Sequence, residues 1–156
     1  RITADCPVID PLIIDTLITS FLAGKYDYFY LSGGFPDGLD TSIISYSCLK
    51  RASELAELKS EREHVVPFIE KNSAIFNIGK LEIFKDLSRF RWTLDEEQDL
   101  KFLTKIYKRL YKDGSIFYTN DILDLLDKEP KLLKINNMIT RNEGYLKSIA
   151  DDLNSQ

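Results

Sequence analysis

The chain opens with Arg1-Ile2-Thr3-Ala4-Asp5-Cys6-Pro7-Val8-Ile9-Asp10, and the local signals in this segment predict a strand, a loop and a helix. Apolar residues alternate over residues 1–4, as in a β-strand. The strand should end at Asp5-Cys6-Pro7, because proline cannot donate a hydrogen bond to a central ladder. A helix should then run from Pro11 to Ala23, with Asp10 as its N-cap and Gly24 as its stop.

Strand and helix signals continue to alternate along the chain. Further strands are predicted at residues 26–31, 41–46, 76–83 and 89–94. Further helices are predicted from a Ser47 cap to Leu58, over residues 60–71 with a bend or restart at Pro67, and from the acidic run 95–97 to about Lys112. Interleaved strands and helices indicate an α/β layer architecture.

The pattern changes after Gly114. Asn120 can cap a short helix over residues 122–126, and residues 130–137 and 142–153 are predicted to be helical or irregular, with no strand between them. We therefore divide the chain into an α/β portion, residues 1–113, and a helical C-terminal appendage, residues 114–156.

Composition excludes several classes of protein. The 156 residues include 21 Lys and Arg against 25 Asp and Glu, a formal net charge of -4. This sign argues against a dedicated nucleic-acid binder. No apolar run approaches the roughly 18 residues of a membrane span. Cys6 and Cys48 lie far apart with no CxxC spacing, so we expect reduced thiols in a cytoplasmic protein rather than a zinc site.

Two aspartates stand where predicted strands end. Asp5 follows residues 1–4, and Asp95 follows residues 91–94. Ligands of open α/β sheets bind outside the carboxyl ends of the strands, and Mg²⁺ is commonly held there by one or two carboxylates together with substrate phosphates. Aspartate also commonly stops strands and caps helices, so the pattern alone leaves a metal site and a structural role open.

Two other features could bind a ligand. His64, the only histidine, lies among charged residues and could act in acid–base chemistry or bind an anion, although an ordinary helical histidine has the same pattern. The turn-rich segment 35–40 could wrap a polar substrate through its exposed amides, as many glycine-containing turns can.

Five stretches, taken in order, resemble a known family. They match spore coat polysaccharide biosynthesis cytidylyltransferase-like proteins, which are similar to the acylneuraminate and 3-deoxy-manno-octulosonate cytidylyltransferases. The stretches are Arg1 to Asp10, Phe35-Pro36-Asp37-Gly38-Leu39-Asp40, Arg62-Glu63-His64-Val65, Arg91-Trp92-Thr93-Leu94-Asp95 and Asn142-Glu143-Gly144-Tyr145. The resemblance covers residues 1 to about 150 and implies part of a three-layer α/β/α nucleotide-diphospho-sugar transferase fold. Residues 1–113 would be the C-terminal portion of the cytidylyltransferase domain.

The resemblance also implies a reaction. CTP and a sugar, commonly a sugar acid, would give a CMP-sugar and pyrophosphate for surface polysaccharide synthesis. Mg²⁺ would neutralise charge on the attacked phosphate and on the leaving pyrophosphate. By position, Asp5 and Asp95 match the two metal-binding aspartates of the family. Such enzymes are often homodimers.

The resemblance suggests sugar-contacting residues, while the catalytic residues stay unknown. Asp37 and Gly38 fall where relatives contact the sugar. The segment Arg62, Glu63 and His64 would lie near the sugar pocket, and the Arg62 guanidinium is suited to a carboxylate.

The chain departs from the family in one respect. Relatives begin with a loop rich in Gly, Arg and Lys that holds the CTP phosphates, and no stretch of residues 1–156 resembles that loop. We therefore expect the N-terminal nucleotide-binding half to be missing, the chain to be a piece of a longer protein, and these residues alone to be inactive.

Two alternative functions stay open. One is a glycosyltransferase of related fold, although the Asp-x-Asp pair typical of that class is absent from the sequence. The other is a non-catalytic interaction or regulatory domain.

Overall fold

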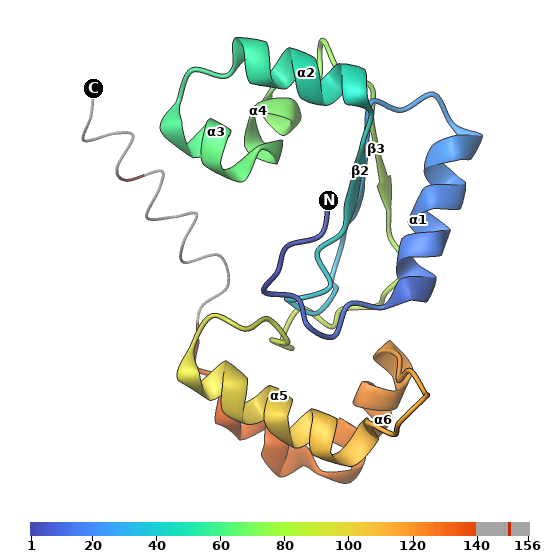
Figure 1. Cartoon of the computed structure of the whole chain (residues 1–156), viewed down its shortest axis with the longest axis vertical. Coiled ribbons are helices and arrows are strands. Elements are labelled where there is room, and N and C mark those ends of the chain that lie inside the picture. Colours follow the sequence, from blue (N-terminus) through green and yellow to red (C-terminus); the bar gives the residue numbers. More distant parts are fainter. Residues whose placement is uncertain (140–149, 151–156) are drawn as a thin grey trace.

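The computed structural model describes residues 1–139 and 150, and a small mixed sheet lies at its centre (Figure 1). The strand order is β2-β1-β3. The central strand β1 (Tyr28–Leu31) pairs antiparallel with β2 (Ser42–Ile44) and parallel with β3 (Ile78–Leu81). Side chains alternate between the two faces of a strand, so Phe29 and Leu31 join the main core while Tyr28 and Tyr30 face the other side.

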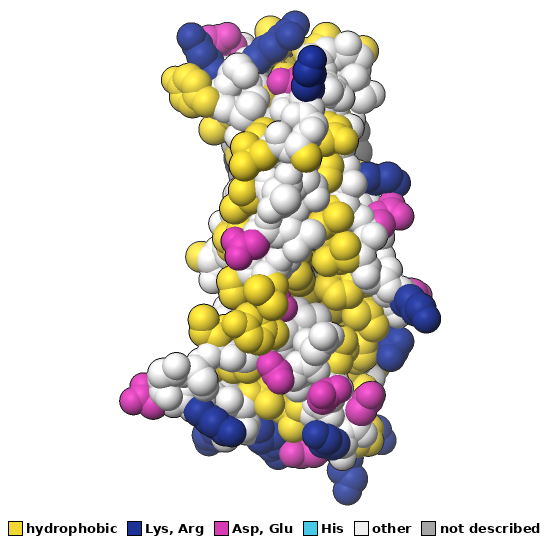
Figure 2. Space-filling view, turned by 90° about the vertical axis from the view of Figure 1, so that its right-hand side faces the viewer, with side chains coloured by type: hydrophobic (Ala, Val, Ile, Leu, Met, Phe, Trp, Pro, Cys, Tyr) yellow, Lys and Arg dark blue, Asp and Glu magenta, His cyan; other side chains and the backbone are white. Residues whose placement is uncertain are grey.

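Helix α1 (Pro11–Ala23) covers one face of this sheet and has the bounds that the sequence predicts (Figure 1). The Asp10 carboxylate caps it by accepting a hydrogen bond from the Leu12 amide, 2.9 Å away, and Pro11 occupies the first turn. Ile13 and Leu17 are buried toward the core. Apolar side chains also gather on the outer side of the molecule at this helix (Figure 2), and those exposed on α1 are Leu12, Ile18 and Leu22.

Three helices follow the antiparallel strand. Helix α2 (Tyr46–Leu55) is capped by Ser45, whose hydroxyl accepts from the Cys48 amide, so the predicted Ser47 cap is wrong by two residues. Helices α3 (Lys59–His64) and α4 (Val66–Lys71) confirm the predicted restart of the 60–71 helix. The break falls at Val65, whose φ of 68° cannot continue a right-handed helix.

A second helical layer packs at the other end of the molecule (Figure 1). It contains α5 (Glu97–Leu110), α6 (Thr119–Lys128) and the 3₁₀-helix η1 (Pro130–Ile135). Residues Ile122 and Leu126 of α6 share one core with Leu17 and Trp92, so residues on both sides of Gly114 contribute to it. The division of the chain at residue 114 stays a prediction. The segment 142–153, predicted to be helical or irregular, lies outside the described residues except for residue 150.

Two predicted strands do not form, at residues 1–4 and 89–94. Ile2 pairs with Thr41 only as an isolated bridge, and Arg91 pairs with Asp37 in the same way. The second segment changes partner along its length: the Trp92 amide donates to the Asp37 carbonyl, and the Leu94 amide donates to the Asp5 carbonyl. A strand needs several consecutive pairs with one neighbour, so this segment ties two loops together instead.

The predicted α/β class is confirmed. One face of the sheet packs against α1. Tyr28 and Tyr30 turn away from α1, toward the side where α3 and α4 lie. Among residues 1–139 and 150, no helix combines the length and the apolar character needed to cross a membrane.

Candidate functional site

A pocket of about 890 Å³ opens on the tyrosine side of the sheet, between α3–α4 and the beginning of α5. Segments from distant parts of the chain form its wall, including the opening loop, the 35–42 loop and residues 91–96. Carboxylates are the most frequent charged groups of its lining: Asp5, Asp37, Asp40, Glu70, Asp95 and Glu96. Such a wall suits a metal cation or the hydroxyl and amine groups of a ligand.

The two aspartates predicted to bind metal both line this pocket. Backbone contacts bring them together, since the Leu94 amide donates to the Asp5 carbonyl at 2.8 Å and the Thr93 hydroxyl donates to the same oxygen at 3.1 Å. The Asp95 side chain is 49% exposed. The geometry therefore leaves the Asp95 carboxylate accessible from the pocket, while the metal role of both residues stays a prediction.

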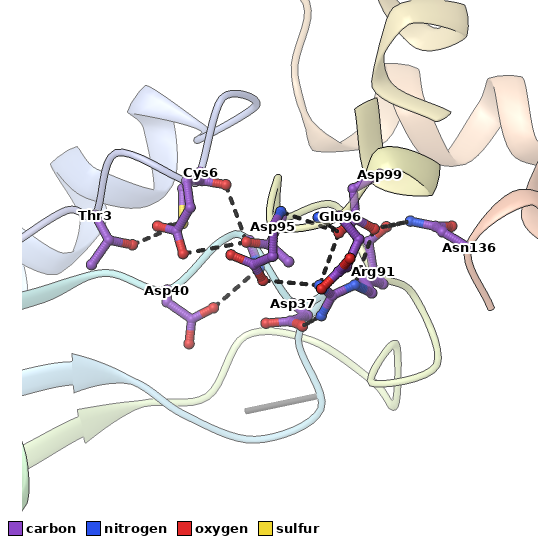
Figure 3. Close-up of polar contacts among 12 residues, drawn as sticks. Thr3, Cys6, Asp37, Asp40, Arg91, Asp95, Glu96, Asp99 and Asn136 are labelled. Carbon is purple, nitrogen blue, oxygen red and sulfur yellow. Dashed lines mark hydrogen bonds and ion pairs between the residues drawn. The ribbon is translucent and has the colours of Figure 1, made fainter. Parts of the chain in front are cut away.

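Arg91 lies between three carboxylates at the floor of the site (Figure 3). Its Nη1 donates to Asp37 Oδ2 and its Nη2 to Asp95 Oδ2, each at 2.9 Å. Its Nε and Nη2 also form a bidentate pair with Asp99, at 3.0 and 2.9 Å. A planar guanidinium is the one side chain that can bridge carboxylates in several fixed directions at once.

Asp99 is the fully buried member of this cluster. Burial by itself raises the pKa of a carboxyl, but hydrogen bonds from Arg91, Asn136 and the amides of Glu96 and Asp95 outweigh it and hold the pKa of Asp99 below its usual value. The carboxylate is therefore ionised at neutral pH and forms a buried, paired charge.

Asp37 and Gly38 belong to the loop that follows β1. The Asp37 side chain lines the pocket and is bound by Arg91. Gly38 has a φ of 101°, and a Cβ there would lie 2.6 Å from the Thr93 nitrogen and from the Trp92 carbonyl carbon. Gly38 is absent from the pocket lining, so its place in the site is to let the loop approach residues 92–93 closely.

Arg62, Glu63 and His64, expected near the sugar pocket, do not all line one pocket. His64, at the end of α3, lines the main pocket. The Arg62 guanidinium instead donates to the carbonyls of Ala56 and Ser53 at the end of α2, at 2.8 and 3.3 Å, and lines a second pocket of about 230 Å³. Glu63 is exposed and lines neither of these two pockets.

Two tyrosines and a cysteine also line the pocket. Tyr28 and Tyr30 stack with ring centroids 5.1 Å apart, and the Tyr28 hydroxyl donates to Glu70 Oε1. Burial raises the pKa of Tyr28, with Glu70 adding to the effect. Burial also raises the pKa of Cys6, to about 11, so this free thiol is a poor nucleophile at neutral pH.

Comparison with known proteins identifies relatives of this chain. No protein-family model matches the chain. Over 149 residues, 93% of the chain, it is 31% identical to the uncharacterised protein MJ1063 of Methanocaldococcus jannaschii, of which it covers 59%. It is 23% identical over 133 residues to the spore coat polysaccharide biosynthesis protein SpsF of Bacillus subtilis, covering 83% of the chain and 55% of SpsF.

A solved structure has the same fold. The cytidylyltransferase of Leptospira borgpetersenii serovar Hardjo-bovis matches 83% of the chain with a TM-score of 0.76 and 27% identity, over 55% of that enzyme. These similarities support a cytidylyltransferase-like family for the chain. They confirm the resemblance and the fold expected from the sequence, and the chain spans a little over half the length of these relatives.

The sequence-based hypothesis missed several residues of the site. Arg91 lies in a predicted strand between Phe90 and Trp92, and a charged side chain among buried aromatics is itself a signal of a buried ion pair. Asp99 shares the helix face of Phe102, Leu103 and Ile106, which is the buried face of α5. Asn136 and Glu70 had no comparable local signal, because their partners are far away in the sequence.

Proposed function

We propose that the protein is a Mg²⁺-dependent cytidylyltransferase that converts CTP and a sugar, commonly a sugar acid, into a CMP-sugar and pyrophosphate for surface polysaccharide synthesis. One observation carries this proposal: Asp5 and Asp95, which match the metal aspartates of the family by position, line the same pocket. Relatedness to SpsF, whose name refers to spore coat polysaccharide, supports a sugar substrate and a role in polysaccharide synthesis.

The donor set of the pocket fits Mg²⁺. Among residues 1–139 and 150, no group of three or more His, Cys, Asp or Glu side chains could hold a metal by itself. Mg²⁺ usually binds one or two carboxylates and fills its other positions with water and substrate phosphates. Asp5 and Asp95 supply such carboxylates, and a bound Mg²⁺ would neutralise charge on the attacked phosphate and the leaving pyrophosphate.

The other pocket residues would bind and orient the sugar. The stacked Tyr28 and Tyr30 rings provide a flat apolar surface, and Asp37 and His64 provide polar groups around it. Gly38 would act through the shape of the loop. Arg62 is engaged at the end of α2, so a sugar carboxylate would need another cation.

The nucleotide would be bound largely by other residues. No stretch of residues 1–156 resembles a phosphate-binding loop rich in Gly, Arg and Lys. We therefore propose that residues 1–156 expressed alone release no pyrophosphate from CTP.

The test is pyrophosphate release from CTP by the full-length protein, with a panel of neutral, amino and acidic sugars. We expect Asp5→Asn and Asp95→Asn each to lower kcat/KM by more than about 100-fold, because loss of a metal ligand should cost more than the 10- to 100-fold typical of residues that only support ligands. Asp15→Asn, on the exposed side of α1, should leave it unchanged. Full activity of Asp95→Asn would refute the metal assignment, and no pyrophosphate release with any sugar would favour the non-catalytic alternative.

A further inference from the structure

We propose that Arg91 is a positioning residue, which holds the Asp95 carboxylate in the orientation that binds the metal ion, with Asp99 and Asn136 as its anchors. This inference rests on the proposed function, because it concerns the same metal site. The cluster is built from three parts of the chain: the 35–40 loop, the segment 91–99 and the end of η1.

The Arg91 guanidinium has a fixed orientation because Asp99 binds it through two hydrogen bonds. Nε and Nη2 donate to the two carboxylate oxygens of Asp99 at 3.0 and 2.9 Å. The Arg91 side chain is 9% exposed and that of Asp99 is 0% exposed. A bidentate pair that is buried on both sides leaves the guanidinium plane little freedom to rotate.

The fixed guanidinium in turn restrains Asp95. Nη2 donates to Asp95 Oδ2 at 2.9 Å. The Asp95 side chain is about half exposed, and an exposed carboxylate without such a partner would sample several rotamers. With Oδ2 engaged by Arg91, we assign the other oxygen, Oδ1, to the metal.

Asp99 restrains Asp95 from the backbone side as well. Its Oδ2 accepts hydrogen bonds from the amides of Asp95 and Glu96, at 3.2 and 3.0 Å, which fixes the chain at the beginning of α5. One buried carboxylate therefore orients both the main chain and, through Arg91, the side chain of Asp95.

Asn136 completes the anchor from the C-terminal side. Its Nδ2 donates to Asp99 Oδ1 at 2.9 Å and to the Arg91 carbonyl at 3.0 Å. Ile139, three residues further on, lines the main pocket. The end of η1 is thus attached to the residues that orient Asp95.

The charges of the cluster are compatible with a cation nearby. One guanidinium serves three carboxylates, Asp37, Asp95 and Asp99, so the cluster keeps an excess of negative charge beside the pocket. Arg91 can therefore orient Asp95 without cancelling the attraction of the site for a divalent cation.

The experiment measures Mn²⁺ binding to the full-length protein by the electron paramagnetic resonance signal of free Mn²⁺. Arg91→Lys keeps the charge but cannot form the bidentate pair and reach Asp95 together. We expect this variant to bind Mn²⁺ on the order of 10- to 100-fold more weakly, as for other residues that support metal ligands. Arg109→Lys is the matched control, because Arg109 pairs with Glu129 on the surface and lies outside the pocket lining.

Further measurements distinguish a positioning role of Arg91 from a purely structural role. A positioning role predicts that Arg91→Lys raises the Mg²⁺ concentration for half-maximal pyrophosphate release while the circular dichroism spectrum stays native. If Arg91→Lys does not fold, Asn136→Ala removes only the outer anchor and should weaken Mn²⁺ binding to a smaller extent. A folded Arg91→Lys or Asn136→Ala variant with unchanged Mn²⁺ affinity overturns the inference.

The inference and the proposed function can fail separately. If Asp95→Asn loses Mn²⁺ binding and Arg91→Lys does not, the metal site stands and Arg91 is structural. If Asp95→Asn binds Mn²⁺ as tightly as the unchanged protein, the metal site itself is wrong and the Arg91 inference fails with it.

Discussion

At the scale of single residues, two glycines differ in why they are needed. Gly38 and Gly114 both adopt a positive φ, 101° and 72°. At Gly38 a Cβ would collide with the backbone of Trp92 and Thr93, whereas at Gly114 it would meet no atom within 4 Å. Substitution at Gly114 therefore measures the energetic cost of the left-handed backbone alone. Substitution at Gly38 adds the cost of the steric clash.

We predict that Gly38→Ala destabilises the protein by about 3 kcal/mol or more, because backbone strain and displacement of residues 92–93 add together. Gly114→Ala should cost only about 1 kcal/mol, the strain alone. Urea unfolding of both variants, followed by circular dichroism, measures the difference. Equal losses of stability would show that the loop yields to the added Cβ at no cost.

At the scale of elements, helix α1 and three of the five predicted strands follow their local signals, and the strands predicted at residues 1–4 and 89–94 do not form. Asp10, Pro11 and Gly24 bound α1 as the sequence predicts, because a cap, a first-turn proline and a stop are all read within a few residues. Residues 89–94 have strand-like alternation, yet their hydrogen bonds go to two different loops. Pairing of strands depends on distant partners, which alternation alone does not specify.

One cap also joins two elements. Asp10 Oδ1 accepts from the Leu12 amide in α1, and its Oδ2 accepts from the Thr119 amide at the beginning of α6, each at 2.9 Å. Ser45 makes a cap contact with Cys48 in α2 and a contact with the Ser47 hydroxyl. Asp10 therefore connects two helices, α1 and α6, whereas Ser45 caps α2 alone.

We predict that Asp10→Ala lowers the free energy of unfolding by about 2–4 kcal/mol, since it removes a cap and leaves the buried Thr119 amide unpaired. Ser45→Ala should cost about 1 kcal/mol, as an ordinary cap does. Thermal and urea unfolding of both variants test this. A loss for Asp10→Ala no larger than that for Ser45→Ala would mean that the link to α6 contributes nothing.

At the scale of the whole molecule, the pocket is where the layers meet. Its wall takes residues from the opening loop, the sheet, α3–α4 and the beginning of α5. A ligand bound there would contact all of these segments, and binding to the folded state alone raises the stability of the whole protein.

We predict that Mg²⁺ with CTP raises the melting temperature of the full-length protein. At a hundred times the dissociation constant, the gain in the free energy of unfolding should be about 2.7 kcal/mol. Asp5→Asn and Asp95→Asn should lose most of this gain, and Asp15→Asn should keep it. Differential scanning fluorimetry with and without Mg²⁺ measures it, and an equal gain in all four proteins would place the cation elsewhere.

The sequence alone was enough for the α/β class, the helix from Pro11 to Ala23, the restart between α3 and α4, and the family resemblance. Caps, periodicity and ordered motifs lie within short segments and can be read without the tertiary structure. The sequence also singled out Asp5, Asp37, His64 and Asp95, which all line one pocket. Only the tertiary structure separated Arg62 from that pocket and brought Arg91, Asp99 and Asn136 together. The reason is physical: a buried ion pair is specified by the approach of segments distant in the chain, and short-range patterns do not contain that approach.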